Sequence, residues 1–264
     1  MSIKTFISIS VLSFLALSCQ NSDSSQAADL QSSSSEKAES VKMEKAKSGA
    51  YPTWESDSAA QAYLELYGAE NPERKIRIKT DFGDIDIELY SNTPVHRANM
   101  IYLIKEHQYF NGTWFHRVSK DHVIQAGNND EYSLKKRRDK IGKYELPAEA
   151  LGSNYHSYGA VAMARSYSNN PEKKSDPFEF YINLGKTYSE AQLKLMEEEY
   201  DISLNAEQVQ LYSSVGGSPH LDQEHTVIGR VLKGMDVVEE IAKVETDQGE
   251  WPLKNIPIQI ILNK

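Results

Sequence analysis

Two short segments around residue 80 alternate strictly between apolar and polar side chains, and this pattern limits what the chain can fold into. In Ile76 to Lys79 and in Ile85 to Leu89 every second residue is isoleucine or leucine, which predicts strands with one dry face. Later segments are also clear: strands at 226–231 and 256–262, and helices at 98–104 and 235–244. Short strands with few helices predict a closed or nearly closed antiparallel sheet.

An arginine and a glutamine lie in a second candidate hairpin. Arg117 follows Phe115 and His116, and Gln125 stands eight residues further on. If the two segments pair, alternation along each strand puts the guanidinium of Arg117 and the amide of Gln125 on one face. Such a pair suits recognition of a peptide group, because the amide can accept and donate and the cation can donate to a polarisable atom. The alternative is an ordinary solvent-exposed arginine on a strand.

Residues 74–264 resemble a cyclophilin, the cyclosporin-binding class of peptidyl-prolyl isomerase. The resemblance rests on segments in the order of that family: the strand pair at 76–89, a Thr-Pro helix start at 93–100, an aromatic-Asn-Gly-Thr turn at 109–113 before Phe-His-Arg at 115–117, and the segments 159–165, 178–182 and 220–231. It implies a mainly β fold, a closed eight-stranded antiparallel β-barrel capped by two helices. It also implies isomerisation of X–Pro bonds in proline-containing polypeptides, with no cofactor and no metal.

The chemistry of that reaction needs one well-placed donor. An X–Pro bond rotates over a barrier of about 18–20 kcal/mol, because the peptide C–N bond has partial double-bond character. A guanidinium that donates to the prolyl nitrogen would weaken the conjugation and stabilise the twisted state without a covalent intermediate. The resemblance assigns this catalytic role to Arg117.

The resemblance also implies a set of substrate-binding positions. They are an apolar dish for the proline ring (His122, Val123, Tyr181 and Leu221), an amide partner and a pocket wall (Gln125 and His225), a strand beside the substrate backbone (Ala164 and Arg165), Glu179 where the family has glutamine, and His220 where cyclosporin-sensitive members have an indole.

Several of these positions depart from the family pattern. His122 and Val123 replace phenylalanine and methionine, and losing about 60–80 Å² of apolar contact would cost about 1.5–2 kcal/mol of substrate binding. Ionised Glu179 can only accept hydrogen bonds, and we expect it to pair with Arg117 or Arg165 and hold them away from substrate. We therefore expect a slow isomerase. The alternative is a peptide-binding module or chaperone with little or no catalysis.

The first residues have the features of a bacterial lipoprotein signal. Lys4 precedes an apolar run, Phe6 to Leu17, which has signal-peptide length and is too short to span a bilayer. The run ends in a segment that resembles a lipobox, so we predict a signal peptide at 1–18 and lipid on Cys19, the only cysteine. Because Gln20 follows, we expect a cell-envelope protein that is held through this lipid at the outer membrane and faces the periplasm.

Two segments before the barrel carry no expected chemistry. Residues 19–50 are rich in serine and poor in apolar side chains, so we expect a disordered tether. Residues 51–73 predict a short helix capped by Ser56 or Ser58, which packs on the outside of the barrel and stops before Gly68 and Pro72.

Residues 186–217 form an insertion that the simple family pattern lacks. Ser189 and Asn205 are each followed three residues later by glutamine, which predicts two capping boxes and two short helices. The insertion runs directly into His220. It either walls the substrate groove or packs only on itself, and the sequence leaves both possibilities open.

The composition argues against other classes of function. A net charge of −9 disfavours nucleic-acid binding, and we expect a monomer whose partners are proline-containing polypeptides and the membrane. Seven histidines raise the alternative of a metal hydrolase, but His220 to His225 lacks the His-Glu-x-x-His spacing. A purely structural lipoprotein, the remaining alternative, would not need arginine, glutamine and histidine to converge.

Overall fold

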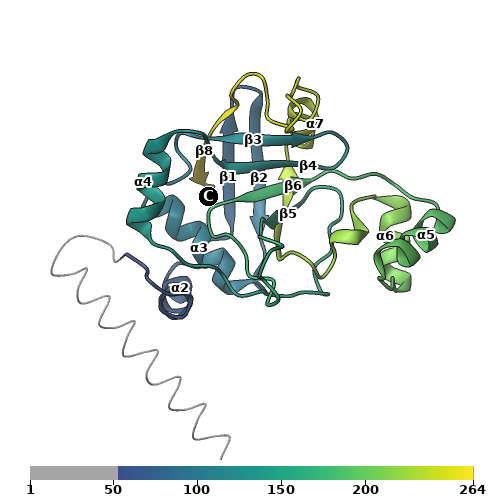
Figure 1. The fold of residues 1–264 in the computed structure, drawn as a ribbon, viewed down its shortest axis with the longest axis horizontal. Coiled ribbons are helices and arrows are strands. Elements are labelled where there is room, and N and C mark those ends of the chain that lie inside the picture. Colours follow the sequence, from purple (N-terminus) through teal and green to yellow (C-terminus); the bar gives the residue numbers. More distant parts are fainter. Residues whose placement is uncertain (1–52, 264) are drawn as a thin grey trace, which may run out of the picture.

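The computed structural model describes residues 53–263, which fold around a closed antiparallel β-barrel (Figure 1). Around the barrel the strands follow the order β1-β2-β7-β5-β6-β4-β3-β8, and each strand pairs antiparallel with both neighbours. The strands are β1 (Lys75–Thr80), β2 (Gly83–Leu89), β3 (Thr113–Ser119), β4 (Val123–Asn128), β5 (Ala160–Met163), β6 (Phe180–Asn183), β7 (Val227–Lys233) and β8 (Pro257–Leu262). The expected fold class is confirmed.

The predicted signal segment at 1–18, Cys19 and the predicted tether at 19–50 lie outside the described residues. Tyr51 and Pro52 of the predicted N-terminal helical segment also lie outside them. Between residues 53 and 263, none of the helices combines the length and the apolar character needed to cross a membrane.

The alternating pattern of β1 and β2 fills the barrel. Ile76 pairs with Ile87 and Ile78 with Ile85, and all four side chains are buried. On the other face of the same strands Arg77 donates to a carboxylate oxygen of Asp86 at 2.6 Å. Buried side chains fill the interior of this eight-stranded barrel, and the pocket described below lies outside it.

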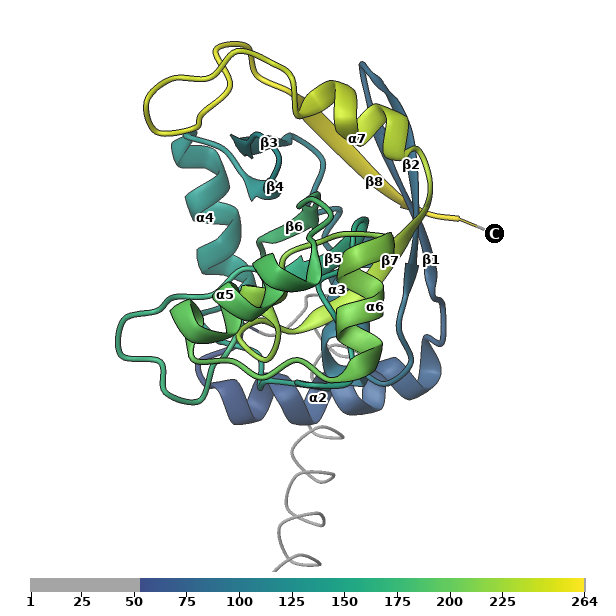
Figure 2. The same ribbon diagram turned by 90° about the vertical axis from the view of Figure 1, so that its right-hand side faces the viewer.

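The two expected helices cover the ends of the barrel (Figures 1 and 2). Helix α3 (Pro94–Lys105) has proline in its first turn, where the missing N–H breaks no hydrogen bond, and most of its residues are buried. Helix α7 (Met235–Ile241) begins after Gly234 and contacts β2, burying Val238 and Ile241.

Helix α4 (Tyr132–Ile141) was not expected from the sequence. It is mostly charged and buries only Leu134 and Ile141, so it has no apolar stripe that would predict a helix. Two arginines hold it in place instead: Arg137 donates to three backbone carbonyls of the turn before β3, and Arg138 donates to the carbonyl of Gly127 on β4.

The N-terminal helix α2 (Asp57–Glu70) is longer than expected. Ser56 caps it, accepting a hydrogen bond from the backbone of Ala59, but the helix continues through Gly68 instead of stopping before it. It packs mainly on helix α3, outside the barrel. A methyl group on Gly68 would lie 2.9 Å from the Cβ of Ala98, so the small residue lets the two helices approach closely.

The insertion contains the two predicted helices, α5 (Glu190–Tyr200) and α6 (Ala206–Ser214). Both capping boxes are confirmed, with Ser189 and Asn205 as the N-caps. The helices lie together at one side of the barrel (Figures 1 and 2), and a short 3₁₀ helix, η1 (Pro219–Leu221), leads from them back to it.

We predict that Gly127→Ala destabilises the protein by about 3 kcal/mol or more. Gly127 has a φ of +103°, and a Cβ there would lie 2.1 Å from the carbonyl oxygen of Phe178, so backbone strain and a clash with the main chain add together. Urea unfolding measures the loss. The control is Gly112→Ala, where φ is +86° but no atom lies within 4 Å of the added Cβ; it should cost about 1–2 kcal/mol. Equal losses in the two variants would contradict this account.

Candidate functional site

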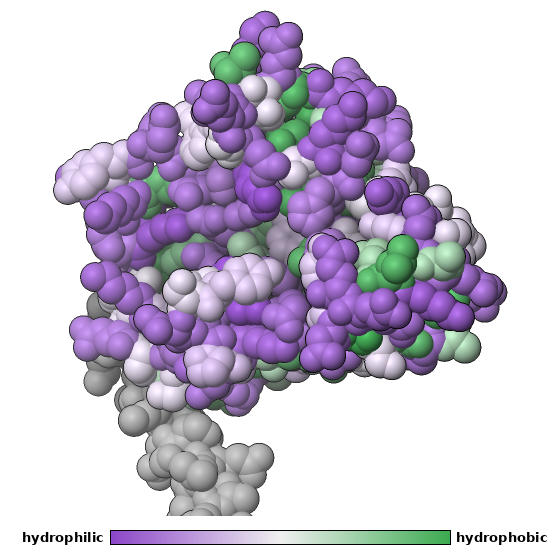
Figure 3. All heavy atoms as spheres, turned by 45° about the vertical axis from the view of Figure 1, so that its right-hand side comes forward, coloured by the Kyte–Doolittle hydropathy of each residue, from purple (hydrophilic) through white to green (hydrophobic). Residues whose placement is uncertain are grey.

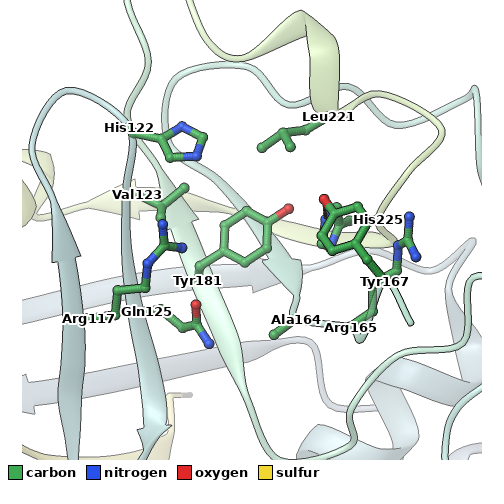
Figure 4. Close-up of a pocket in the computed structure, with 10 residues that line it drawn as sticks. All are labelled: Arg117, His122, Val123, Gln125, Ala164, Arg165, Tyr167, Tyr181, Leu221 and His225. Atoms are coloured by element: carbon green, nitrogen blue, oxygen red, sulfur yellow. Dashed lines mark hydrogen bonds between the residues drawn. The ribbon is translucent and has the colours of Figure 1, made fainter. Parts of the chain in front are cut away.

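A pocket of about 150 Å³ lies on the outer face of the barrel (Figure 4). Its lining comes from β3, β4 and the turn between them, from β6, from the loop after β5, and from η1 and the segment that follows it: Arg117, His122, Val123, Gln125, Ala164, Arg165, Tyr167, Tyr181, Leu221 and His225. In Figure 3 apolar side chains reach the surface near the middle of this side of the molecule, among mostly hydrophilic ones.

Three strands align one row of the pocket. Arg117 on β3 pairs directly with Gln125 on β4, and Gln125 pairs with Tyr181 on β6. Residues opposite one another in an antiparallel pair point to the same face, so the three side chains lie side by side along the pocket (Figure 4). The predicted shared face of Arg117 and Gln125 is confirmed.

Glu250, in the loop before β8, holds the guanidinium of Arg117. The Nε of Arg117 donates to Glu250 at 2.7 Å, and the hydroxyl of Ser119 donates to the other carboxylate oxygen at 2.5 Å. The backbone N–H of Val118 donates to the carbonyl of Glu250 at 2.8 Å, which fixes the loop against β3. Within residues 53–263 the two Nη groups of Arg117 make no hydrogen bond, so they remain free donors.

The expectation that Glu179 pairs with Arg117 or Arg165 is wrong. Glu179 is an ion-pair partner of Arg138 at 3.0 Å and lies 3.4 Å from the Nε2 of His116. Burial favours a raised pKa for Glu179, but His116 and Arg138 outweigh it and lower the pKa to about 2. Glu179 does not line the pocket, and its carboxylate is held by Arg138 in a partly buried ion pair.

Glu179 instead orients the amide of Gln125. The Nε2 of Gln125 donates to the carboxylate at 2.9 Å, and a carboxylate can only accept. The amide nitrogen is therefore turned away from the pocket, and the oxygen of Gln125 points into it (Figure 4). Gln125 thus presents an acceptor to a ligand.

The right-hand wall in Figure 4 is built around His225. Its Nδ1 lies 3.1 Å from the carbonyl of Met163 and its Nε2 lies 2.7 Å from the hydroxyl of Tyr167. A carbonyl only accepts, so Nδ1 carries the proton and Nε2 accepts from Tyr167. Burial lowers the pKa of His225 to about 4, so the ring is neutral at neutral pH.

Tyr167 was missed by the sequence reasoning. It lies in the loop after β5, between the two family-like segments 159–165 and 178–182. The guanidinium of Arg165 lies 4.2 Å from the centre of its ring, and Arg165 is itself ion-paired with Glu224. Arg165 therefore supports the wall formed by His225 and Tyr167.

The backbone beside the wall differs between Ala164 and Arg165, the two positions expected to lie beside a substrate backbone. Ala164 lines the pocket, but its N–H donates to the carbonyl of Glu179 and its carbonyl accepts from the N–H of Asp176. Its backbone is therefore occupied. Within the described residues, the backbone N–H and carbonyl of the next residue, Arg165, make no hydrogen bond.

The floor of the pocket is a small apolar cluster on the outer face, separate from the barrel core. Val123, Tyr181 and Leu221 belong to it, and His122 lines the edge above Val123. His220 does not line the pocket, since its ring stacks between those of His122 and Tyr200, 5.7 and 5.0 Å away. His220 lies one ring away from the pocket and backs His122.

Comparison with known proteins agrees with this geometry. A family model described as cyclophilin type peptidyl-prolyl cis-trans isomerase/CLD matches residues 75–261, more than half of the chain. The chain belongs to the cyclophilin family.

Relatives of this cyclophilin are named as peptidyl-prolyl isomerases. Proteins named "Putative peptidyl-prolyl cis-trans isomerase" from Staphylococcus saprophyticus and Staphylococcus aureus are 27% and 28% identical to it over 189 residues, which are 72% of this chain and 91% of each relative. A Cryptosporidium parvum cyclophilin type peptidyl-prolyl cis-trans isomerase, crystallised in the presence of the dipeptide Ala-Pro, superimposes with a TM-score of 0.52 at 20% identity, covering 72% of this chain and 99% of that one. The latter likeness concerns the fold.

The cyclophilin pocket contains every predicted position except Glu179 and His220. Tyr167 and Glu250 were not predicted, because each comes from a loop and reaches the site only through the fold. Among residues 53–263, no three histidine, cysteine, aspartate or glutamate side chains are grouped so that they could hold a metal ion.

We predict that His225 makes stability depend on pH. Its pKa falls from the usual 6.5 to about 4 on folding, chiefly through burial. Between these values the unfolded chain binds a proton that the folded protein does not, so the free energy of unfolding should fall as the pH drops from 6.5 to 4. In His225→Gln this fall should be shallower, as measured by urea unfolding at several pH values. Parallel pH profiles of the two proteins would contradict the prediction.

Proposed function

We propose that this cyclophilin accelerates cis-trans isomerisation of X–Pro bonds in exported proteins, with Arg117 donating to the prolyl nitrogen. The observation that carries the proposal is the state of Arg117. Glu250 fixes its Nε, while both Nη groups are free beside a small apolar floor. A donor that is oriented before the substrate arrives stabilises the transition state without reorganising.

The remaining lining residues have complementary roles in this proposal. The proline ring would rest on Val123, Tyr181 and Leu221, and the backbone of the residue before proline would pair with the free N–H and carbonyl of Arg165. Gln125 would accept from a peptide N–H, since its oxygen faces the pocket. Nothing in this scheme is a nucleophile, so the reaction is a rotation held by hydrogen bonds.

The positions where the pocket departs from the family pattern determine the expected rate of isomerisation. His122 and Val123 line the pocket, and both offer less apolar area than phenylalanine and methionine. We expect weaker substrate binding than in members with the larger residues. Glu179 does not reduce the rate in the way the sequence suggested, since it never reaches Arg117.

We predict that Arg117→Lys lowers kcat/KM for a proline-containing tetrapeptide by at least about tenfold, or about 1.4 kcal/mol of transition-state stabilisation. Lysine keeps the charge but loses the planar fork that allows one nitrogen to bond Glu250 while the others face substrate. A coupled isomerisation assay measures the rate, with Arg117→Ala as the full deletion and the exposed Arg230→Lys as control.

Binding of the ground-state peptide should change much less, because the prolyl nitrogen is a poor acceptor until the amide twists. Wild-type turnover in Arg117→Lys would contradict the mechanism. A wild-type protein that binds the peptide without accelerating its isomerisation would instead support the peptide-binding alternative.

We further propose that the protein is a lipid-anchored protein of the bacterial cell envelope. The support is the sequence before the barrel: a signal-like run at 1–18, a lipobox-like segment ending at Cys19, and a serine-rich stretch at 19–50. Two or more acyl chains on Cys19 would supply the anchor, with the barrel held at the periplasmic face of the outer membrane.

We predict that Cys19→Ala releases the full-length protein from membranes without loss of isomerase activity. The change removes the acceptor for lipid and lies far outside the barrel in sequence. Cell fractionation followed by immunoblotting measures the partition, and Ser18→Ala serves as a neighbouring control that keeps the thiol. Membrane association of the Cys19→Ala protein after signal cleavage would rule out this anchor.

A further inference from the structure

The inward side of the inserted helices is polar as well as apolar. The buried residues of α5 and α6 are Leu193, Gln208 and Tyr212. Leu193 accounts for ordinary packing, but Gln208 and Tyr212 bring an amide and a hydroxyl into the protein. Buried polar groups are costly unless they are bonded, so their partner matters.

That partner is the carboxylate of Asp222, which follows η1. The hydroxyl of Tyr212 and the Nε2 of Gln208 both donate to Oδ2, at 2.7 and 2.8 Å. The backbone N–H of His156 donates to Oδ1 at 2.8 Å, and the Nδ1 of the same histidine lies 3.1 Å from it. Asp222 is therefore buried with donors on both oxygens, two of them from the insertion.

His156 carries the contact on to the pocket. The carboxylate of Asp222 can only accept, so the Nδ1 of His156 carries the proton. The Nε2 of the same ring is then an acceptor. The hydroxyl of Tyr181 lies 2.9 Å from that Nε2 and donates to it. His156 is fully buried, and its ring is nearly parallel to that of Tyr181 at an interplanar angle of 17°.

A second contact runs from the insertion to the pocket edge. Tyr200, the last residue of α5, stacks on His220, and His220 stacks on His122. No residue of 186–217 lines the pocket itself. The insertion thus neither walls the groove nor packs only on itself, because it reaches two pocket residues from behind.

We propose that the α5–α6 insertion positions the pocket floor, with Tyr212, Gln208, Asp222 and His156 acting as positioning residues for Tyr181. This rests on the proposed function, since it assigns the support of the proline site. Tyr181 has a ring that must lie flat under the substrate and a hydroxyl that must not turn toward it. The hydrogen-bonded chain fixes both, and it starts in the insertion, at Tyr212 and Gln208.

The test is a double-mutant cycle between the two ends of the chain. Tyr212→Phe removes only the hydroxyl that donates to Asp222, and the buried ring stays. We expect KM for a proline-containing tetrapeptide to rise about threefold or more, with kcat within about twofold of wild type. In a Tyr181→Phe background, which lacks the last hydroxyl of the chain, Tyr212→Phe should change KM by less than about 1.5-fold.

Tyr188→Phe is the matched control. It also removes a tyrosine hydroxyl from the insertion, but the hydroxyl of Tyr188 makes no hydrogen bond within the described residues. Circular dichroism and urea unfolding confirm that each variant is folded. If the wild type shows no isomerase activity, calorimetric Kd values for the same peptide replace KM. The positioning role of the insertion can then be tested even if the proposed isomerase function fails. An equal effect of Tyr212→Phe in both backgrounds, or a loss of stability with unchanged KM and Kd, would overturn the positioning role.

Discussion

The antiparallel register of β3, β4 and β6 is the constraint on which the rest of the site depends. Arg117, Gln125 and Tyr181 lie in one row because each is directly opposite the next. Side chains alternate between the faces of a strand, so a slip of one residue in β4 would turn Gln125 into the barrel and leave Arg117 without its neighbour. The buried isoleucines of the barrel oppose such a slip, since it would expose them. The same apolar pattern that closes the barrel therefore aligns the groups on its outside.

Much of the fold could be read from the sequence, because it depends on local patterns. Strict alternation identified β1 and β2, and glutamine three residues after Ser189 and Asn205 identified both capping boxes. Helix α4 was missed for a physical reason: arginines bonded to carbonyls of other segments stabilise it, and it has almost no apolar face. Glu250 and Tyr167 were missed because the residues that hold them at the site, Arg117 and His225, lie far from them in sequence. Glu179 was assigned to the wrong arginine, since the sequence contained no sign that Arg138 would lie beside it.

Two carboxylates outside the pocket lining support it. Glu179 accepts from the amide of Gln125 and orients it, and Asp222 accepts from His156, which bonds the hydroxyl of Tyr181. Near Glu179, burial and the negative charge of Glu179 raise the pKa of Asp176 to about 6, while cationic neighbours lower that of Glu179. Two acidic groups in one buried region thus divide their roles, one ionised at all ordinary pH values and one close to titration. A pocket without charged lining carboxylates is in this way shaped by charges placed one layer behind it.

The pocket floor and the barrel core are separate apolar clusters, with Val123, Tyr181 and Leu221 in the smaller one. Under the proposed function, substitutions in the floor would therefore change which peptides are accepted, while the core keeps its packing. A lineage can replace phenylalanine by histidine at position 122, or methionine by valine at position 123, and still inherit a stable barrel. The scaffold leaves substrate preference open to drift and selection, whereas the barrel interior is held to a narrow range of volumes.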